Sequence, residues 1–338
     1  MKPALKKRLS PAKLTEDRGV ALIVVLWIFI FLFVVAFEFS TAAREEAYGA
    51  HRFGDEIQGY YLAVAGFERG LYDFLGQPSA GSAMQQGQKG DLLDGEWRED
   101  HLGGGAFRVR LVDEGGKINL NRVSDTTLRR VFTHLGIDPV RRDVLVDSIM
   151  DWRDPDDLHR ASGAESDYYA SLEPAYTAKN GPFDSVEELL WVKGMSRELF
   201  FGRSEVIPPT TEDPGIALRE IFTVDSPIDR VNLRTASANV IHALTGIPLE
   251  RCRSFVEERR KLSEKTLGDL LPLLGIGAGD AMLQMFIFTN PAVVAVQSEG
   301  RLESGTAIRR VKGIVRLGGA RGFELIRWVD RDMALPES

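Results

Sequence analysis

The sequence predicts an α+β protein: a long N-terminal transmembrane helix, then an antiparallel sheet that carries a large inserted helical domain. Three observations predict this fold. An unbroken run of 18 apolar residues covers 20–37. Apolar and polar residues alternate within 77–121 and 291–338, which is the period of strands with one solvated face. Between these segments, a pattern typical of helices occurs twice.

Composition limits the class of protein. The chain has 338 residues, 44% of them hydrophobic, which is enough for two or three compact domains. Residues 19–338 hold 36 Lys and Arg against 47 Asp and Glu, a net charge of −11. This acidic body disfavours nucleic acid as a partner. Cys252 is the only cysteine, so an intrachain disulfide is excluded.

The first element is a membrane helix over 20–37, because 18 helical residues rise about 27 Å, close to the hydrocarbon thickness of a bilayer. A basic leader over 1–19 precedes it, which predicts a cytoplasmic N-terminus and a single span. A cleavable secretory signal is a weaker alternative, because its apolar region is shorter and the nearest small-residue site, Ser40-Thr41-Ala42, lies beyond Glu38. A plain membrane anchor is the simplest alternative.

The same helix is expected to continue through 38–76, because no proline occurs between Pro11 and Pro78. Apolar residues recur there at spacings of three and four, as on one face of a helix. These residues are Ile57, Tyr60, Val64, Phe67, Leu71 and Phe74. Five glycines in this stretch weaken the helix: Gly49, Gly54, Gly59, Gly66 and Gly70.

Strands and loops follow. Residues 78–105 are rich in Gly and Gln and are expected to form a loop. "AFRVRLVDEGGKINLN" predicts a strand, a turn and a second short strand, whereas "AVVAVQSEGR", "AIRRVKGIVRLGG" and "GFELIRWVDR" predict three more strands near the C-terminus. Together they are expected to form one antiparallel sheet from 77–121 and 291–338.

The intervening region contains an internal repeat. "KINLNRVSDTTLRRVFTHLGI" parallels "RVNLRTASANVIHALTGI", and "SVEELLWVKGMSREL" parallels "TLGDLLPLLGIGAGDA". Two helical units are therefore expected, over 122–210 and 211–290, and Ser185 with Glu188 forms a capping box at one helix start. The units resemble SAM-like or helix–hairpin–helix modules. The DNA-binding form of that hairpin uses flanking cations, but 266–300 has no Lys or Arg and Asp280 stands there instead, which favours a structural role.

The segment 147–183 is the most chemically specific. Residues 151–167 hold six acids, Asp151, Asp154, Asp156, Asp157, Glu165 and Asp167, against Arg153 and Arg160. Oxygen ligands at this density favour Ca²⁺. Asp154, Asp156 and Glu165 match positions 1, 3 and 12 of an EF-hand, but Leu158 and His159 replace a ligand and the turn glycine, so the loop is no EF-hand. A solvated acidic loop without an ion is the alternative.

Catalysis is not indicated. The sequence lacks the nucleophile-elbow, zinc-protease, P-loop and dinucleotide-binding motifs, and its five histidines are scattered. We therefore expect a protein that is not an enzyme and has no organic cofactor.

The N-terminal pattern resembles a known family. A basic leader ending in Gly19, then "VALIVVLWIF" and an amphipathic helix, is similar to the type IV pilins and to the pseudopilins of type II secretion. The resemblance implies a pilin-like fold, cleavage by prepilin peptidase after Gly19 and methylation of Val20. Most members carry glutamate at the fifth mature position, where this chain has Val24. Since a buried carboxylate in lipid needs a partner, its loss suggests a subunit with none ahead of it.

The acidic segment extends the resemblance to the K-type minor pseudopilins, through D-W-x-D-x-D, G-A-E-x-x-Y-Y and P-x-Y-x-x-x-N-G-P-F. That family implies a place at the tip of the pseudopilus, partners in the minor pseudopilins I and J and in the inner-membrane assembly platform, and an inner-membrane anchor with the bulk in the periplasm of a Gram-negative bacterium. It also implies structural Ca²⁺. The candidate ligands are Asp154, Asp156, Glu165, Asp167 and Asn180.

Two other functions stay open on the sequence alone. A minor pilin of a type IV pilus would share the same leader and assembly chemistry. A membrane-anchored DNA-binding protein of the competence type would use the helix–hairpin–helix repeats, and salt-sensitive affinity for duplex DNA would distinguish it.

Overall fold

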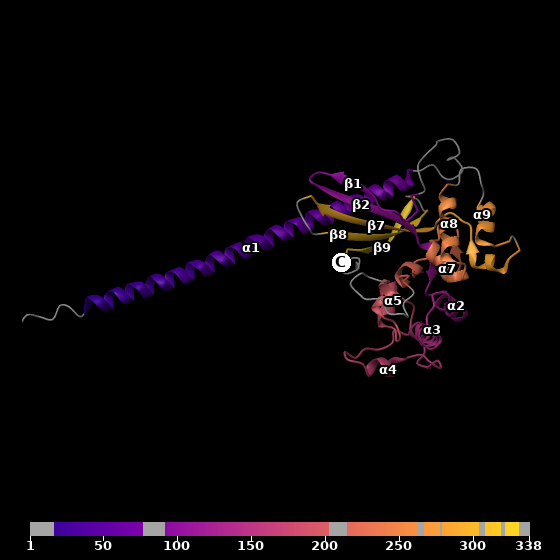
Figure 1. The fold of residues 1–338 in the computed structure, drawn as a ribbon, viewed down its shortest axis with the longest axis horizontal. Helices are drawn as coiled ribbons and strands as arrows, with labels where there is room; N and C mark the ends of the chain where they lie inside the picture. The colour runs from indigo at the N-terminus through magenta and orange to yellow at the C-terminus, as the bar shows by residue number, and fades with distance from the viewer. Residues whose placement is uncertain are drawn as a thin grey trace, which may run out of the picture. The chain divides into compact units, whose positions relative to one another are not determined.

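The computed structural model describes residues 17–76, 92–202, 215–261, 267–277, 279–303, 308–318 and 322–330. The chain divides into two compact units, Met1–Ile57 and Gln58–Ser338. In its described part, the first unit is the N-terminal portion of the helix α1, Asp17–Leu75 (Figure 1). From Leu22 to Phe39 its large apolar side chains are exposed, and within the described residues α1 is the one helix long and apolar enough to cross a membrane.

In the second unit, the last turns of α1 pack on one face of a sheet. Ala63, Phe67 and Leu71 are buried there, at the spacing of four that places them on one side of the helix. The Phe67 ring meets Trp328 edge to face, with the ring centroids 4.9 Å apart. The apolar stripe predicted for this part of the helix is therefore the face that covers the sheet.

Two glycines allow this helix and the sheet to approach closely. A Cβ added at Gly66 would lie 2.3 Å from Ser298 Oγ, and one at Gly300 would lie 2.2 Å from the carbonyl oxygen of Gly59. Since glycine lowers helix propensity, the sequence indicated Gly66 as a weak point of the helix. In the structure Gly66 instead makes room for the side chains of Ser298 and Phe107, whereas Gly300 makes room for the backbone of the helix.

The sheet has the order β1-β2-β7-β8-β9, and every neighbouring pair is antiparallel (Figure 1). Its strands are β1 Arg98–Leu102, β2 Gly105–Asp113, β7 Val293–Leu302, β8 Ile308–Leu317 and β9 Phe323–Val329. The expectation of a loop across 78–105 was wrong for β1. β1 is an edge strand and is largely exposed, so its sequence "REDHL" shows no alternation of apolar and polar residues. The sequence pattern therefore did not indicate that it pairs with β2.

The helical domain is inserted between β2 and β7 and contains two units of related design. The first consists of β3 Ile118–Asn119, α2 Asp125–His134, α3 Pro139–Arg153, α4 Ser166–Ala170, a 3-10 helix Val186–Trp191, α5 Arg197–Phe201, α6 Leu218–Ile221 and β4 Phe222–Thr223. The second consists of β5 Val231–Asn232, α7 Ala238–Thr245, α8 Leu249–Arg260, α9 Leu267–Leu274, a 3-10 helix Ala281–Met285 and β6 Phe286–Ile287.

A short parallel pair closes each unit, because β3 pairs with β4 and β5 pairs with β6. The first unit therefore runs from 118 to 223, later than the boundary near 210 that the sequence indicated. "KINLN", expected in the main sheet, belongs to this small pair instead. One apolar core is continuous through both units and includes Leu128, Phe132, Ile241 and Phe255. The α+β fold with a long helix, an antiparallel sheet and an inserted helical domain is confirmed.

Candidate calcium site in the acidic segment

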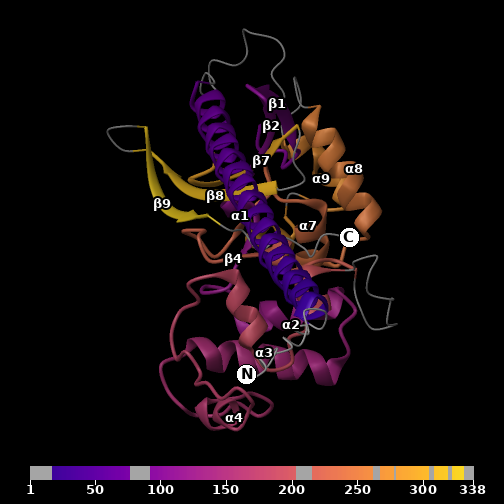
Figure 2. The same cartoon turned by 90° about the vertical axis from the view of Figure 1, so that its left-hand side faces the viewer.

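The acidic segment begins where α3 ends. Asp138 starts α3, since its carboxylate accepts hydrogen bonds from the backbone N–H groups of Val140 and Arg141, and Pro139 occupies the first turn. After Arg153 the chain leaves the helix, turns through 154–165 and enters α4, which lies on the side of α3 away from the sheet (Figures 1 and 2).

Three carboxylates converge in this turn. Asp154, Asp156 and Glu165 each offer one oxygen, and these oxygens all lie within 4.8 Å of one another. Glu165 is buried, Asp154 is half-buried and Asp156 is exposed, so the group opens to solvent on one side. Among the described residues, this is the one group of three or more His, Cys, Asp or Glu arranged so that a metal ion could be held.

Several oxygens around this group have no hydrogen-bond donor. They are Asp151 Oδ1, Asp154 Oδ1, both carboxylate oxygens of Glu165 and Asn180 Oδ1. Glu165 is only 1% exposed and Asp151 is fully buried. Buried polar atoms are nearly always paired, because an unpaired one costs about 1–3 kcal/mol. Five such oxygens in one place fit the donor set of a hard cation such as Ca²⁺.

Burial and the closeness of these carboxylates favour their protonated forms. Burial, followed by the negative charges of Asp151 and Asp154, raises the pKa of Glu165 to about 7. Burial also raises the pKa of Asp151 and of Asp154. A bound divalent cation would oppose these shifts, since it favours the charged form of each carboxylate.

Asp151 is held against the backbone of the turn. Its Oδ2 accepts a hydrogen bond from the backbone N–H of Arg160 at 3.2 Å. A Cβ on Gly163 would lie 1.8 Å from that same oxygen, so only glycine permits the close approach. Lys193 then fixes Gly163 from outside by donating to its carbonyl oxygen at 2.9 Å.

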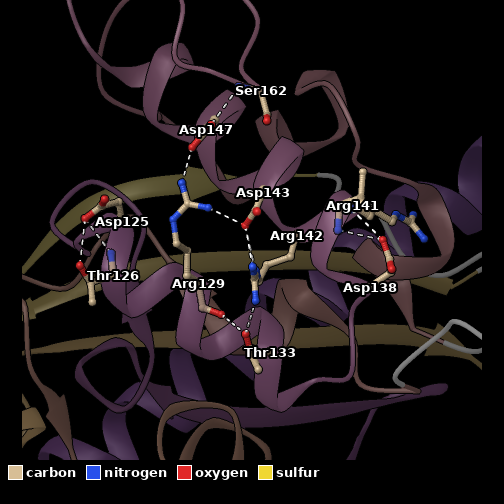
Figure 3. Close-up of polar contacts among 11 residues, drawn as sticks. Asp125, Thr126, Arg129, Thr133, Asp138, Arg141, Arg142, Asp143, Asp147 and Ser162 are labelled. Carbon is tan, nitrogen blue, oxygen red and sulfur yellow. Dashed lines mark hydrogen bonds and ion pairs between the residues drawn. The ribbon is translucent and has the colours of Figure 1, made fainter.

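One helical turn earlier, Asp147 anchors the same loop (Figure 3). Its Oδ2 accepts from the backbone N–H of Ser162 at 3.0 Å, and its Oδ1 pairs with Arg129 of α2 at 2.5 Å. Arg129 also contacts Asp143 at 2.6 Å, so a single guanidinium ties two acids of α3 to α2. The loop is therefore attached to the folded core at two successive turns of α3.

Aromatic rings support the site from behind. Trp152 and Tyr169 lie edge to face with centroids 5.2 Å apart, and Tyr176 stacks on Tyr169 at 5.1 Å. Glu188 completes the support: it accepts from Trp152 Nε1 at 3.4 Å and pairs with Lys179 at 2.9 Å. The predicted capping box of Ser185 with Glu188 is present. These contacts bring 176–188 alongside the end of α3.

The structure brings some of the candidate ligands together and separates others. Asp154, Asp156 and Glu165 converge, and Asn180 leaves its Oδ1 without a donor while its Nδ2 donates to Asp157 at 2.8 Å. Asp167 lies apart, since its exposed carboxylate contacts His159 at 2.9 Å.

Asp151 is a further member of the site that the sequence reasoning left out. Its position three residues before Asp154, on the last turn of α3, was the available signal.

The segment that contains these acids lies in a part of the chain that matches a known family. Residues 110–201, which include the acidic segment, match the family described as type II secretion system protein K. A type II secretion system protein K of Escherichia coli K12 is 28% identical over 255 residues, covering 67% of this chain and 74% of that protein. These similarities support a minor pseudopilin of type II secretion that resembles protein K.

A second protein K, from Klebsiella pneumoniae, is 27% identical over 206 residues, which cover 55% of this chain and 60% of that protein. Among solved structures, a chain from the GspK-GspI-GspJ complex of enterotoxigenic Escherichia coli matches with a TM-score of 0.56. The match covers 86% of this chain and 99% of that chain at 15% identity, so it shows a shared fold.

The predicted cleavage site and the predicted membrane segment lie on α1. Gly19 and Val20 belong to the first turns of this helix, and residues 1–16 of the leader lie outside the described residues. Val24 is 51% exposed, within a stretch that has no ionisable side chain before Glu38. The predicted fifth mature position therefore carries an apolar and exposed side chain.

The hairpin residue Asp280 has a structural role. Its carboxylate accepts from the backbone N–H of Met282 at 2.9 Å and so starts the 3-10 helix Ala281–Met285. The side chain that stands where a DNA-binding hairpin would place a cation is thus a cap.

Proposed function

We propose that this minor pseudopilin occupies the tip of the type II secretion pseudopilus, where it helps to start assembly and so supports export of folded proteins across the outer membrane. The observation that carries the proposal is the apolar stretch 20–37, which lacks a carboxylate even at Val24. Each following subunit would offer a glutamate to the amine of the subunit ahead. A first subunit has nothing ahead and gains nothing from a costly buried acid.

The leader supplies orientation and maturation in this proposal. Six basic residues before the span would keep the N-terminus in the cytoplasm and place residues 38–338 in the periplasm. Prepilin peptidase would cleave after Gly19 and methylate Val20. The chain would then be drawn out of the inner membrane by the assembly platform, with no chemical step of its own.

The proposed partners are the minor pseudopilins I and J. Support comes from the fold match to a chain solved in a GspK-GspI-GspJ complex. Co-expression of the full chain with I and J, followed by affinity capture in detergent, tests this proposal. Recovery of a stable ternary complex is expected, and recovery of the chain alone would contradict it.

Mass spectrometry of the mature N-terminus tests maturation. A chain that begins at N-methylated Val20 is expected. An intact Met1, or a start near Ala43, would contradict the proposal. Gly19→Leu should block cleavage and abolish secretion, while Gly49→Leu is a matched control, because a Cβ at Gly49 meets no neighbouring atom in the described residues.

We also propose that the acidic segment binds Ca²⁺ through Asp154, Asp156 and Glu165, with Asp151 and Asn180 as further oxygen donors. When bound, the ion would neutralise adjacent carboxylates and fix 154–165 against α3. Calorimetry of the purified chain with CaCl₂ tests this directly. Saturable binding that EDTA reverses is expected, and no heat of binding together with an unchanged Tm would contradict it.

A further inference from the structure

The side chain of Arg160 lies beside the group of carboxylates that we propose as the calcium site. Its Nε is 3.3 Å from Asp151 Oδ1, and its Nη2 is 3.6 Å from Asp154 Oδ2. Within the described part of the chain, it is the one cationic side chain that comes within ion-pair distance of either acid. The other arginine of the segment, Arg153, points away and donates to the carbonyl oxygens of Leu120 and Val123.

The contacts of Arg160 partly neutralise the negative charge of the site, but they leave several carboxylate oxygens without a hydrogen bond. Although Arg160 lies close, Asp151 Oδ1 has no hydrogen bond, and neither oxygen of Glu165 has one. A planar guanidinium with diverging N–H groups approaches from one side only, whereas Ca²⁺ is a compact ion that accepts six to eight oxygens around it. Arg160 is also 40% exposed at its side chain, so it is free to turn toward solvent.

We infer that Arg160 is an internal counter-ion that competes with calcium and thereby sets the affinity of the site. In the ion-free protein its guanidinium partly neutralises Asp151 and Asp154. When Ca²⁺ enters, the guanidinium is repelled and gives up these two contacts, and the cost of that exchange weakens binding. This inference rests on the proposed calcium site.

The backbone of Arg160 acts separately from its side chain. Its N–H donates to Asp151 Oδ2, and substitution of the side chain leaves that donor in place. Arg160→Gln therefore removes the competing charge and retains the fold of the turn. Arg160→Lys keeps a cation of different shape at the same position.

Calcium affinity of the full chain in detergent micelles, measured by calorimetry at one neutral pH and constant ionic strength, tests the inference. Arg160→Gln is expected to bind Ca²⁺ about tenfold more tightly than the wild type, because a repelling charge within a few Å is gone. Arg160→Lys should stay within about threefold of the wild type. Arg253→Gln is the matched control, since Arg253 pairs with Glu250 in the other helical unit, and the calcium affinity of this variant should not change.

Thermal unfolding of the same variants separates a counter-ion from a merely structural arginine. Arg160→Gln should lower the Tm in EDTA and lose most of that deficit in saturating Ca²⁺. An affinity equal to that of the wild type, or an equal Tm loss with and without calcium, would overturn the role of Arg160 while leaving the calcium site intact. A wild-type chain that binds no calcium would overturn both.

Discussion

The two helical units of this protein share a set of backbone contacts, yet only one of them carries the acidic segment. Asn119 and Asn232 are the last residues of β3 and β5, and the Oδ1 of each accepts a hydrogen bond from the backbone N–H two residues later. The next residue, Leu120 or Leu233, donates its N–H to the strand that closes the unit, at 2.8 and 2.9 Å. The repeat seen in sequence is therefore a repeat of hydrogen bonding.

A pair of arginines extends this equivalence. Arg153 at the end of α3 donates to the carbonyls of Leu120 and Val123, and Arg259 at the end of α8 donates to those of Leu233 and Ala236. Each arginine satisfies carbonyl groups in the turn that precedes the first helix of its own unit. The units are built alike where backbone groups must be paired.

The two units differ in the segment that follows the second helix of each, α3 or α8. In the first unit, 154–185 separates α3 from the 3-10 helix, whereas α9 begins only seven residues after α8. Among the described residues, the buried carboxylate oxygens without a hydrogen-bond partner lie in or beside that insertion. The comparison indicates that the shared contacts support the fold and that an addition to one copy supplies the proposed ion site.

The largest effect is expected from substitutions in the shared core, which test whether the two helical units contribute to it equally. Leu128 in α2 and Ile241 in α7 are both fully buried. Replacing either by Ala should lower the free energy of unfolding by about 3 kcal/mol, through lost burial and the cavity left behind. Denaturant unfolding checks this. A loss confined to Leu128→Ala would mean that the second copy packs independently.

Removing a proposed calcium ligand should sharpen the difference between the copies. At a calcium concentration 100-fold above Kd, binding stabilises the wild type by about 2.7 kcal/mol. Asp154→Asn should lose most of this stabilisation by calcium. In EDTA its Tm should be no lower than that of the wild type, because one of the carboxylates that repel one another is gone. Glu257→Gln in α8 is the control and should keep the full gain. Differential scanning calorimetry with and without Ca²⁺ measures both.

The paired arginines provide the next test. Arg153→Met and Arg259→Met should each cost about 2 kcal/mol, since two carbonyl groups lose a charged donor while the side-chain length is kept. Urea unfolding of both variants measures this cost. Similar values would support equivalent roles, and a near-zero value for either would show that its unit does not depend on the contact.

Helix caps should give a smaller and symmetrical effect. Ser124 and Ser237 each accept a hydrogen bond from the backbone N–H three residues later, in α2 and α7. Replacing either by Ala should cost about 1 kcal/mol. Thermal unfolding should therefore show nearly equal decreases in Tm. Clearly unequal decreases would show that the two serine caps are not equivalent.

A last difference between the two helical units is the pH dependence of the ion-free site. Because the folded-state pKa of Glu165 is raised to about 7, the folded protein binds more protons there than the unfolded chain does. In EDTA, stability should fall as pH rises from about 4.5 to about 7, in the direction opposite to that of a paired carboxylate. Glu165→Gln should abolish this slope, and an unchanged slope would assign it to other groups.

Much of the fold could be predicted because its signals are local. The run 20–37, the spacing of Phe67 and Leu71 and the alternation in β7 and β8 each report the surroundings of a few neighbouring residues. The duplication was also visible, since related contacts demanded related residues such as Asn119 and Asn232. The density of acids after α3 indicated where an ion site was expected.

Only the tertiary structure decided which acids meet. Asp167 and Asp156 look equivalent along the chain, yet the turn over Gly163 directs Asp156 toward Glu165 and leaves Asp167 beside His159. The edge strand β1 likewise depends on a partner strand, and the closing strands β4 and β6 pair with residues 104 and 55 positions earlier. Such contacts are set by the path of the whole chain, and no local pattern records them.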